Sequence, residues 1–397
     1  MSETEPLIEC IAKECYDNFC KVVKKTKQLR KDKQIVIFGA GIMGMQFAYT
    51  LLQLGINDFI FCDNNSEKWD TMLIGKTIKN PLFIQDIGRY FVFLAMENYE
   101  QCAKQLEMME YRQGKNWLLL TNSSGNKILE SFEEKNDATR LVLGDCIVSN
   151  VSIREDDKTS IGELLNRKST VKVLALNGLY MRGYYNILRL CKRKIKYLKE
   201  VYILLNVDIM SGRYFLLPKN QHSDIMRELY KKSEFSDEEM TEFLDIIAER
   251  EKNTNILDMS TPNRNGSLST EEIEKQRRIH MKINFLYRIS ENTESIEYLE
   301  RILDFCRNDN VKIIFVIMPI NYEAGYKYFG DTFKVRYEKI ISVLQKYIIK
   351  GKGEVLDLSY LLQEKDFICL RSVNEGIREH GRKKVAAKIE ERMRGII

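Results

Sequence analysis

Histidine and proline are scarce in this chain of 397 residues, with three and five occurrences. Histidine chemistry is therefore restricted to His222, His280 and His380. Long apolar runs are also missing, since none approaches the roughly 18 residues that a membrane-spanning helix needs. The first residues, which include Glu3 and Glu5, lack the basic-then-apolar order of a signal peptide. We expect no integral membrane segment and a cytoplasmic location.

A strong charge of one sign and a metal-binding cysteine motif are absent too. The 62 Lys and Arg residues and the 57 Asp and Glu residues leave a formal charge of +5, spread along the chain without a basic block. No nucleic-acid partner is therefore expected. The nine cysteines form no C-x-x-C pair, and their odd number leaves one over if all the others bridged. Reduced thiols and no bound metal fit this pattern best.

The sequence does contain two series of alternating strands and helices. Its length favours two to three domains at roughly 150 residues each. The apolar pattern predicts an N-terminal helix over 1–32, a Rossmann-like module over 33–130, and a second domain over 138–397 with a helical insertion at about 224–308. Both domains are expected to be α/β with parallel sheets. The predicted strands are 35–38, 59–62, 90–94 and 117–120 in the first domain, and 140–143, 171–176, 201–206, 311–318 and 355–358 in the second.

A glycine-rich loop follows the first of these strands and precedes a helix. Gly39, Gly41 and Gly44 fit the pattern G-x-G-x-x-G, in which they permit a tight turn, close approach of a pyrophosphate and close helix packing. Asp63 ends the next strand, where an acidic side chain can accept hydrogen bonds from a ribose. The pattern predicts a nucleotide or sugar nucleotide at the helix N-terminus, and an NAD-like dinucleotide is a further alternative. The competing interpretation is that the glycines only close the turn.

The stretch from Gln34 to Leu120, with Asp63-Asn64-Asn65 after its second strand, resembles a known group of modules. These are the small Rossmann-like modules of bacterial sugar and surface-polysaccharide biosynthesis proteins. The resemblance implies a sugar nucleotide or a similar diphosphate as ligand, or a purely structural module. A dehydrogenase is not favoured, because about four strands form only one mononucleotide-binding half.

The second domain opens with a strand that runs into Gly144-Asp145-Cys146. This turn is expected to place Cys146 at the carboxyl end of the sheet, the edge at which open α/β folds bind ligands. The cysteine could serve as a nucleophile if a base or a helix dipole stabilises its thiolate. Alternatively, it is a small apolar side chain packed under the following helix.

Gly144-Asp145-Cys146 resembles the G-D-S opening of the SGNH (GDSL-like) hydrolase superfamily, with cysteine in place of serine. Gly178 after the next strand resembles that family's second-block glycine, and Asn206 resembles its third-block asparagine. The later Met318-Pro319-Ile320-Asn321 and the final helix resemble the branch that includes D-alanine transfer proteins. The resemblance implies a flavodoxin-like three-layer α/β/α domain in which Gly178 and Asn206 donate hydrogen bonds to an oxyanion.

The expected catalytic Asp and His are out of register with the final helix. Counting back from Gly381 places Val373 and Gly376 where the family carries its Asp and its His. His380 lies four residues later and could act as the base only if the loop 374–379 is reshaped. Otherwise it is a surface residue at a helix N-terminus, where the helix dipole disfavours an imidazolium.

Together these patterns predict an intracellular protein of bacterial surface-glycan biosynthesis or modification. Its second domain is expected to be of the esterase or acyltransferase type, with Cys146 in the nucleophile position. The alternative is a non-catalytic nucleotide- or glycan-binding protein that has kept the fold and lost the triad. The expected partners are a nucleotide and a glycan or acyl donor, and the sequence does not indicate the oligomeric state.

Overall fold

The computed structural model describes residues 9–96, 99–120, 126–211, 225, 228, 229, 231, 270–289, 293–369, 373 and 376–396. The chain forms two compact units. Unit 1 contains the described residues up to Leu120 together with Ser152–Lys158, and unit 2 contains the other described residues. None of the helices in these described ranges is long and apolar enough to cross a membrane.

Unit 1 is built on a sheet with the strand order β4-β5-β3-β2-β6-β7. Each neighbouring pair is parallel except β4 with β5, which is antiparallel. The four predicted strands are confirmed, and the short β4 and β5 extend the sheet beyond them. The bounds are β2 (Gln34–Phe38), β3 (Phe59–Cys62), β4 (Met72–Leu73), β5 (Lys76–Lys79), β6 (Tyr90–Leu94) and β7 (Trp117–Leu119).

The N-terminal segment differs from the predicted continuous helix over 1–32. Cys10–Ala12 forms a short strand, β1, and helix α2 covers only Lys13–Lys25. The backbone before the helix is held in place because Ile153 N donates to Glu9 O at 2.8 Å. Phe19 of α2 packs edge-on against Phe47, with ring centroids 5.4 Å apart, so this helix belongs to unit 1. The other helices of the unit are α3 (Ile42–Gln53), α4 (Glu100–Met108), η1 (Ser66–Lys68) and η2 (Pro81–Gln85).

Unit 2 contains a five-stranded sheet with the order β10-β8-β11-β12-β13, in which every neighbouring pair is parallel. Numbered within the unit, this is 2-1-3-4-5, the second common order of doubly wound α/β sheets. All five predicted strands are present. Their bounds are β8 (Arg140–Gly144), β10 (Val171–Ala175), β11 (Glu200–Leu205), β12 (Lys312–Ile317) and β13 (Glu354–Asp357).

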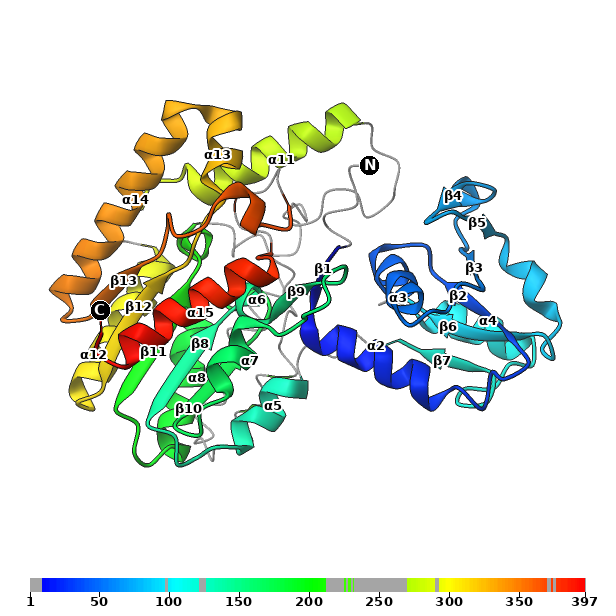
Figure 1. Cartoon of the computed structure of the whole chain (residues 1–397), viewed down its shortest axis with the longest axis horizontal. Helices are drawn as coiled ribbons and strands as arrows, with labels where there is room; N and C mark the ends of the chain where they lie inside the picture. The colour runs from blue at the N-terminus through cyan, green and yellow to red at the C-terminus, as the bar shows by residue number, and fades with distance from the viewer. Residues whose placement is uncertain are drawn as a thin grey trace. The chain divides into compact units, whose positions relative to one another are not determined.

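Alternate residues of these strands enter two separate apolar clusters, because successive side chains of a strand point to opposite faces. Leu143, Ile203 and Phe315 pack with the helices of one face, whereas Val142 and Ile314 belong to the other cluster. Unit 2 is therefore a three-layer α/β/α structure (Figure 1). The first face is covered by α5 (Asn126–Glu133), α8 (Met181–Lys194), α12 (Glu294–Asn308) and α14 (Asp331–Lys350), and the second by α6 (Cys146–Ser149), α7 (Ile161–Asn166) and α15 (Glu379–Met393).

Two predicted boundaries differ from the structure. Helix α5 lies in unit 2, so the boundary between the units precedes residue 126 and not residue 130. Helix α12, which we expected inside the insertion, buries Ile296, Leu299 and Ile302 in the first cluster and is thus a layer helix between β11 and β12. Most of the insertion lies outside the described residues, as does His222, which precedes it, and His280 belongs to α11 (Thr270–Phe285).

Candidate functional sites

In the glycine loop of unit 1, neighbouring atoms leave no room for a side chain at Gly39 or Gly44, but they leave room at Gly41. Gly39 has a φ of +115°, and a Cβ there would lie 2.7 Å from Ala95 O. A Cβ on Gly44 would lie 2.0 Å from Gly39 O. By contrast, a Cβ on Gly41 would meet no atom within 4 Å. Gly41 therefore borders open space at the N-terminus of α3, of which it is the N-cap residue.

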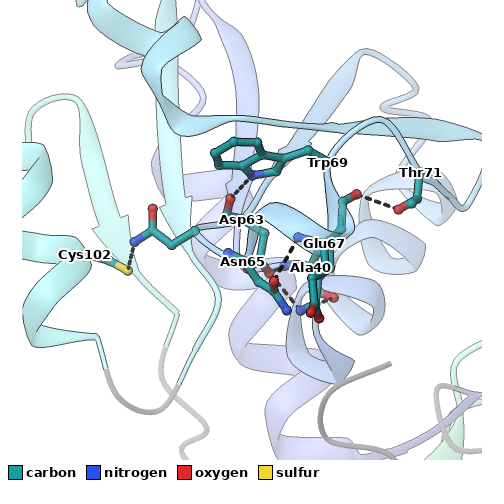
Figure 2. Close-up of polar contacts among 9 residues, drawn as sticks. Ala40, Asp63, Asn65, Glu67, Trp69, Thr71 and Cys102 are labelled. Carbon is teal, nitrogen blue, oxygen red and sulfur yellow. Dashed lines mark hydrogen bonds and ion pairs between the residues drawn. The ribbon is translucent and has the colours of Figure 1, made fainter. Parts of the chain in front are cut away.

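The Asp63 carboxylate is tied to this loop and to the turn that follows β3. Its Oδ2 accepts a hydrogen bond from Ala40 N at 2.9 Å, and its Oδ1 accepts one from Asn65 N at 2.9 Å (Figure 2). The Trp69 indole donates to Asp63 O at 2.7 Å. Asp63 thus fixes the loop conformation, and a ribose hydroxyl would bind to the lone pairs that remain on the same two oxygens.

Lys68 is a site residue that the sequence analysis missed. Its Nζ lies 3.0 Å from Asp63 Oδ2 and 3.4 Å from Ala40 O, so its cation borders the glycine loop. The pair is mostly shielded, with 22% of the Lys68 side chain and 15% of the Asp63 side chain exposed. Asn65 positions the lysine, because its Oδ1 accepts from Glu67 N and starts the short helix η1 that contains Lys68. The sequence did contain a signal for this residue, because a lysine five residues after Asp63 lies in the turn that follows β3.

Anion binding is the chemistry that this arrangement can perform. The first N–H groups of an α-helix have no intrahelical acceptor, and α3 has no side-chain cap among the described residues. Those N–H groups and the helix dipole favour a negative group in front of Gly41. Lys68 adds a positive charge at the side of the loop. The sequence-predicted residues Gly39, Gly41, Gly44 and Asp63 are therefore brought together in one place.

In unit 2, Asp145 organises the carboxyl ends of two strands. It is 3% exposed and serves as the N-cap of α6, with Oδ1 accepting from Ile147 N at 3.1 Å. Its Oδ2 accepts from Asn206 Nδ2 at 2.8 Å. Asn206, also 3% exposed, directly follows β11, the neighbour of β8. One amide hydrogen of Asn206 is therefore committed to Asp145.

Cys146 and Gly178 lie at the same edge of the sheet as Asn206. Cys146 is the first residue of α6 and is partly exposed. Gly178 follows β10, which pairs with the other side of β8, and has a φ of +70°. Their neighbours in sequence are also in contact, since the Ser149 hydroxyl lies 2.9 Å from Asn177 Oδ1. The structure thus brings Cys146, Gly178 and Asn206 to three adjacent strand ends.

His380 pairs with a buried carboxylate and lies at the start of α15. Its Nδ1 is 3.1 Å from Asp366 Oδ1, and 68% of its side chain is exposed, compared with 3% for Asp366. Asp366 also accepts hydrogen bonds from Gln363 N and Lys384 Nζ. Burial raises the pKa of the Asp366 carboxyl, but the bonds from Gln363, His380 and Lys384 outweigh it and hold the pKa below its usual value.

The positions at which the family resemblance implies an Asp and a His carry no titratable group. Val373 is fully buried, and its carbonyl accepts from Asn321 N at 2.7 Å. Gly376 has a φ of +64°, and its carbonyl accepts from Ile368 N at 3.1 Å. An Asp–His pair does exist as Asp366 and His380, from other positions in the chain.

No metal site emerges in the part of the chain that the structure describes, where no group of three or more His, Cys, Asp or Glu side chains is placed to hold an ion.

Comparison with known proteins does not assign the chain to a family. A scan against protein-family models found no match, and neither did a search of curated protein sequences.

Proposed function

We propose that the chain binds a diphosphate-containing nucleotide through unit 1. The observation that carries the proposal is the open space in front of Gly41, next to a helix N-terminus, with Lys68 and Asp63 at its border. The phosphates would accept from the first N–H groups of α3 and from Lys68, and the ribose would bind to Asp63. On binding, Lys68 would exchange part of its contact with Asp63 for the phosphate.

A sugar nucleotide is the nucleotide that we favour. The resemblance of Gln34 to Leu120 to modules of sugar and surface-polysaccharide biosynthesis proteins supports this class. A dinucleotide normally spans two mononucleotide-binding halves of one sheet, and the strand order of unit 1 supplies one such half around β2. We therefore place the protein in the biosynthesis or modification of a bacterial surface glycan.

Intrinsic fluorescence can test this proposal, because Trp69 donates to Asp63 and is one of only two tryptophans. We would titrate the full chain with UDP-glucose, GDP, NAD and inorganic phosphate. Saturable quenching by a nucleotide diphosphate is expected, and it should vanish in Gly41→Val, whose side chain would project into the open space that borders Gly41. Lys68→Met should weaken binding, whereas Lys104→Met, on the exposed side of α4, serves as the matched control. No saturable response to any nucleotide would refute the proposal.

A second candidate function is acyl transfer at Cys146, favoured by the meeting of Asp145, Asn206 and Gly178 at one sheet edge. The thiolate would attack an ester carbonyl, form a thioester and release an alkoxide. The Gly178 N–H and the remaining Asn206 amide hydrogen would stabilise the oxyanion. The released alkoxide needs a proton, and Gly376 has no side chain to provide it. We therefore expect weak catalysis at most, with the non-catalytic binding protein as the alternative.

A further inference from the structure

A cluster of aromatic rings lies beyond the carboxyl ends of β12 and β13. Tyr322, the first residue of α13 (Tyr322–Phe329), is at its centre. The Tyr322 ring is stacked on that of Tyr326, with centroids 6.0 Å apart and an interplanar angle of 24°. It meets the Tyr360 ring edge-on at 5.6 Å. Tyr326 is 46% exposed and Tyr360 is 56% exposed, so two of the three rings present large surfaces to solvent.

Contacts with two buried rings of α14 hold this cluster in place. The fully buried rings of Phe333 and Tyr337 stack at 5.9 Å, and they contact Tyr322 and Tyr360 respectively. The Tyr337 hydroxyl donates to Ser359 Oγ at 3.1 Å. A ligand that used the exposed rings would therefore meet a preorganised surface, which lowers the entropy cost of binding.

Acidic side chains act on the tyrosines of this cluster. The Tyr326 hydroxyl lies 3.4 Å from Asp331 Oδ1. Burial raises the pKa of Tyr360 to about 12, with further contributions from Glu338, Tyr322 and Asp357. Burial raises the pKa of Tyr322 too, followed by Tyr326 and then by Glu338 and Asp331. Lys327, on the same helix as Tyr326, is paired with Glu364.

We propose that Tyr322, Tyr326 and Tyr360 bind the ammonium group of an organic cation. The face of an aromatic ring carries negative electrostatic potential and attracts cations, most strongly when the site is partly desolvated. Glu338, Asp331 and Asp357 add full negative charges that an uncharged apolar ligand would not use. This site lies at the carboxyl edge of the sheet, where doubly wound folds bind ligands, and it does not depend on the nucleotide site of unit 1.

Calorimetric titration of the full chain with choline and with ethanolamine tests this site. Both are positively charged near neutral pH, and the neutral tert-butyl analogue of choline controls for shape. We expect saturable binding of at least one cation and clearly weaker binding of the neutral analogue. A preference for choline would identify a quaternary ammonium as the ligand group, and a preference for ethanolamine would identify a primary amine.

Tyr360→Leu and Glu338→Gln should each weaken cation binding by about three- to tenfold, since each removes one attractive group. The matched controls are Tyr197→Leu, at a tyrosine that is 57% exposed elsewhere in unit 2, and Glu300→Gln on the exposed side of α12. Circular dichroism would verify that each variant is folded. Equal binding of the neutral analogue, no binding of either cation, or equal effects of the control variants would each overturn the proposal.

Discussion

The side-chain amide of Asn206 donates to the carboxylate of Asp145 at 2.8 Å, and both side chains are almost completely buried. This bond joins the residues that follow two neighbouring strands, β8 and β11. Asp145 uses its other oxygen to cap α6, so one carboxylate sets the position of the turn that carries Cys146. The residue that resembles a family's oxyanion donor thus has a structural role.

Asn206→Leu should destabilise unit 2 by about 3 kcal/mol, because it leaves a buried carboxylate without one of its donors. Urea denaturation followed by circular dichroism measures the change in the free energy of unfolding. Asn206→Asp should cost at least as much, since two carboxylates would then face each other. A change in either variant of less than about 0.5 kcal/mol, the scale of an ordinary surface substitution, would contradict this role for the bond.

Gly144→Ala should destabilise the chain by about 1–3 kcal/mol, which is typical of overpacking a core. The new Cβ would lie 2.2 Å from Cγ2 of Val148, a fully buried residue of α6. Val148→Ala removes that methyl group, so the double variant should be more stable than the sum of the two single effects predicts. A double-mutant cycle in urea measures this coupling. Simple additivity would show that the clash is relieved in some other way.

Hydrolysis of p-nitrophenyl acetate should be absent or very weak in the wild type. A missing general acid or base typically lowers a rate by roughly 10²- to 10⁴-fold. Any residual activity should fall in Cys146→Ala and stay unchanged in His380→Ala, in keeping with our expectation that His380 is a surface residue at the start of α15. Robust turnover that both substitutions abolish would instead establish a rearranged Cys–His site.

Stability should fall in acid partly through Asp366. Its pKa is depressed in the folded state by hydrogen bonds from Gln363, His380 and Lys384, although burial acts in the opposite direction. The carboxylate therefore contributes stability that is fully present above the unfolded pKa of about 3.9 and is lost as pH falls through the lower folded pKa. Asp366→Asn should be less stable at neutral pH and should show a shallower loss of stability between about pH 5 and pH 2. Thermal unfolding across this range, with Asp309→Asn as an exposed control, would measure the difference.

Lys68 should matter for ligand binding more than for stability. Its ion pair with Asp63 is shielded but still reached by solvent, and ion pairs near the surface typically contribute about 1 kcal/mol or less. Lys68→Met should therefore leave the melting temperature within a few degrees of the wild type while weakening binding of a nucleotide diphosphate. Lys68→Arg should retain most of the binding. Equal affinity in Lys68→Met and the wild type would exclude a phosphate contact by this lysine.

The sequence predicted every strand of at least four mainly apolar residues, because short apolar runs bounded by turn residues are typical of buried strands. It did not predict β1 and β9 (Asn150–Ser152), which have three residues each, β4, which has two, or β5, in which only Ile78 is buried. Such short strands depend on neighbours for their hydrogen bonds and leave almost no periodic signal.

In both candidate sites, the residues that directly follow strands could be placed from the sequence, since the carboxyl ends of parallel strands lie at the same edge of the sheet. Cys146, Gly178 and Asn206 all follow this rule. The pairing of Asp366 with His380 was not predictable. Counting back from the final helix finds only residues at a fixed sequence distance, whereas Asp366 lies 14 residues before His380. In the structure, Phe367 forms a bridge with Ile377, and this contact brings Asp366 back to the start of α15.

The assignment of Ser152–Lys158 to unit 1 makes that unit discontinuous in sequence, and this limits how the protein can be divided. The Ser152 hydroxyl donates to the buried Glu9 carboxylate at 2.6 Å, and Arg154 donates to the Tyr49 hydroxyl at 3.2 Å. A fragment that ended at Ser123 would lack both donors and would leave the Glu9 charge without its hydroxyl partner. An isolated nucleotide-binding fragment must therefore be built with residues 152–158 grafted on, or with that segment added as a separate peptide.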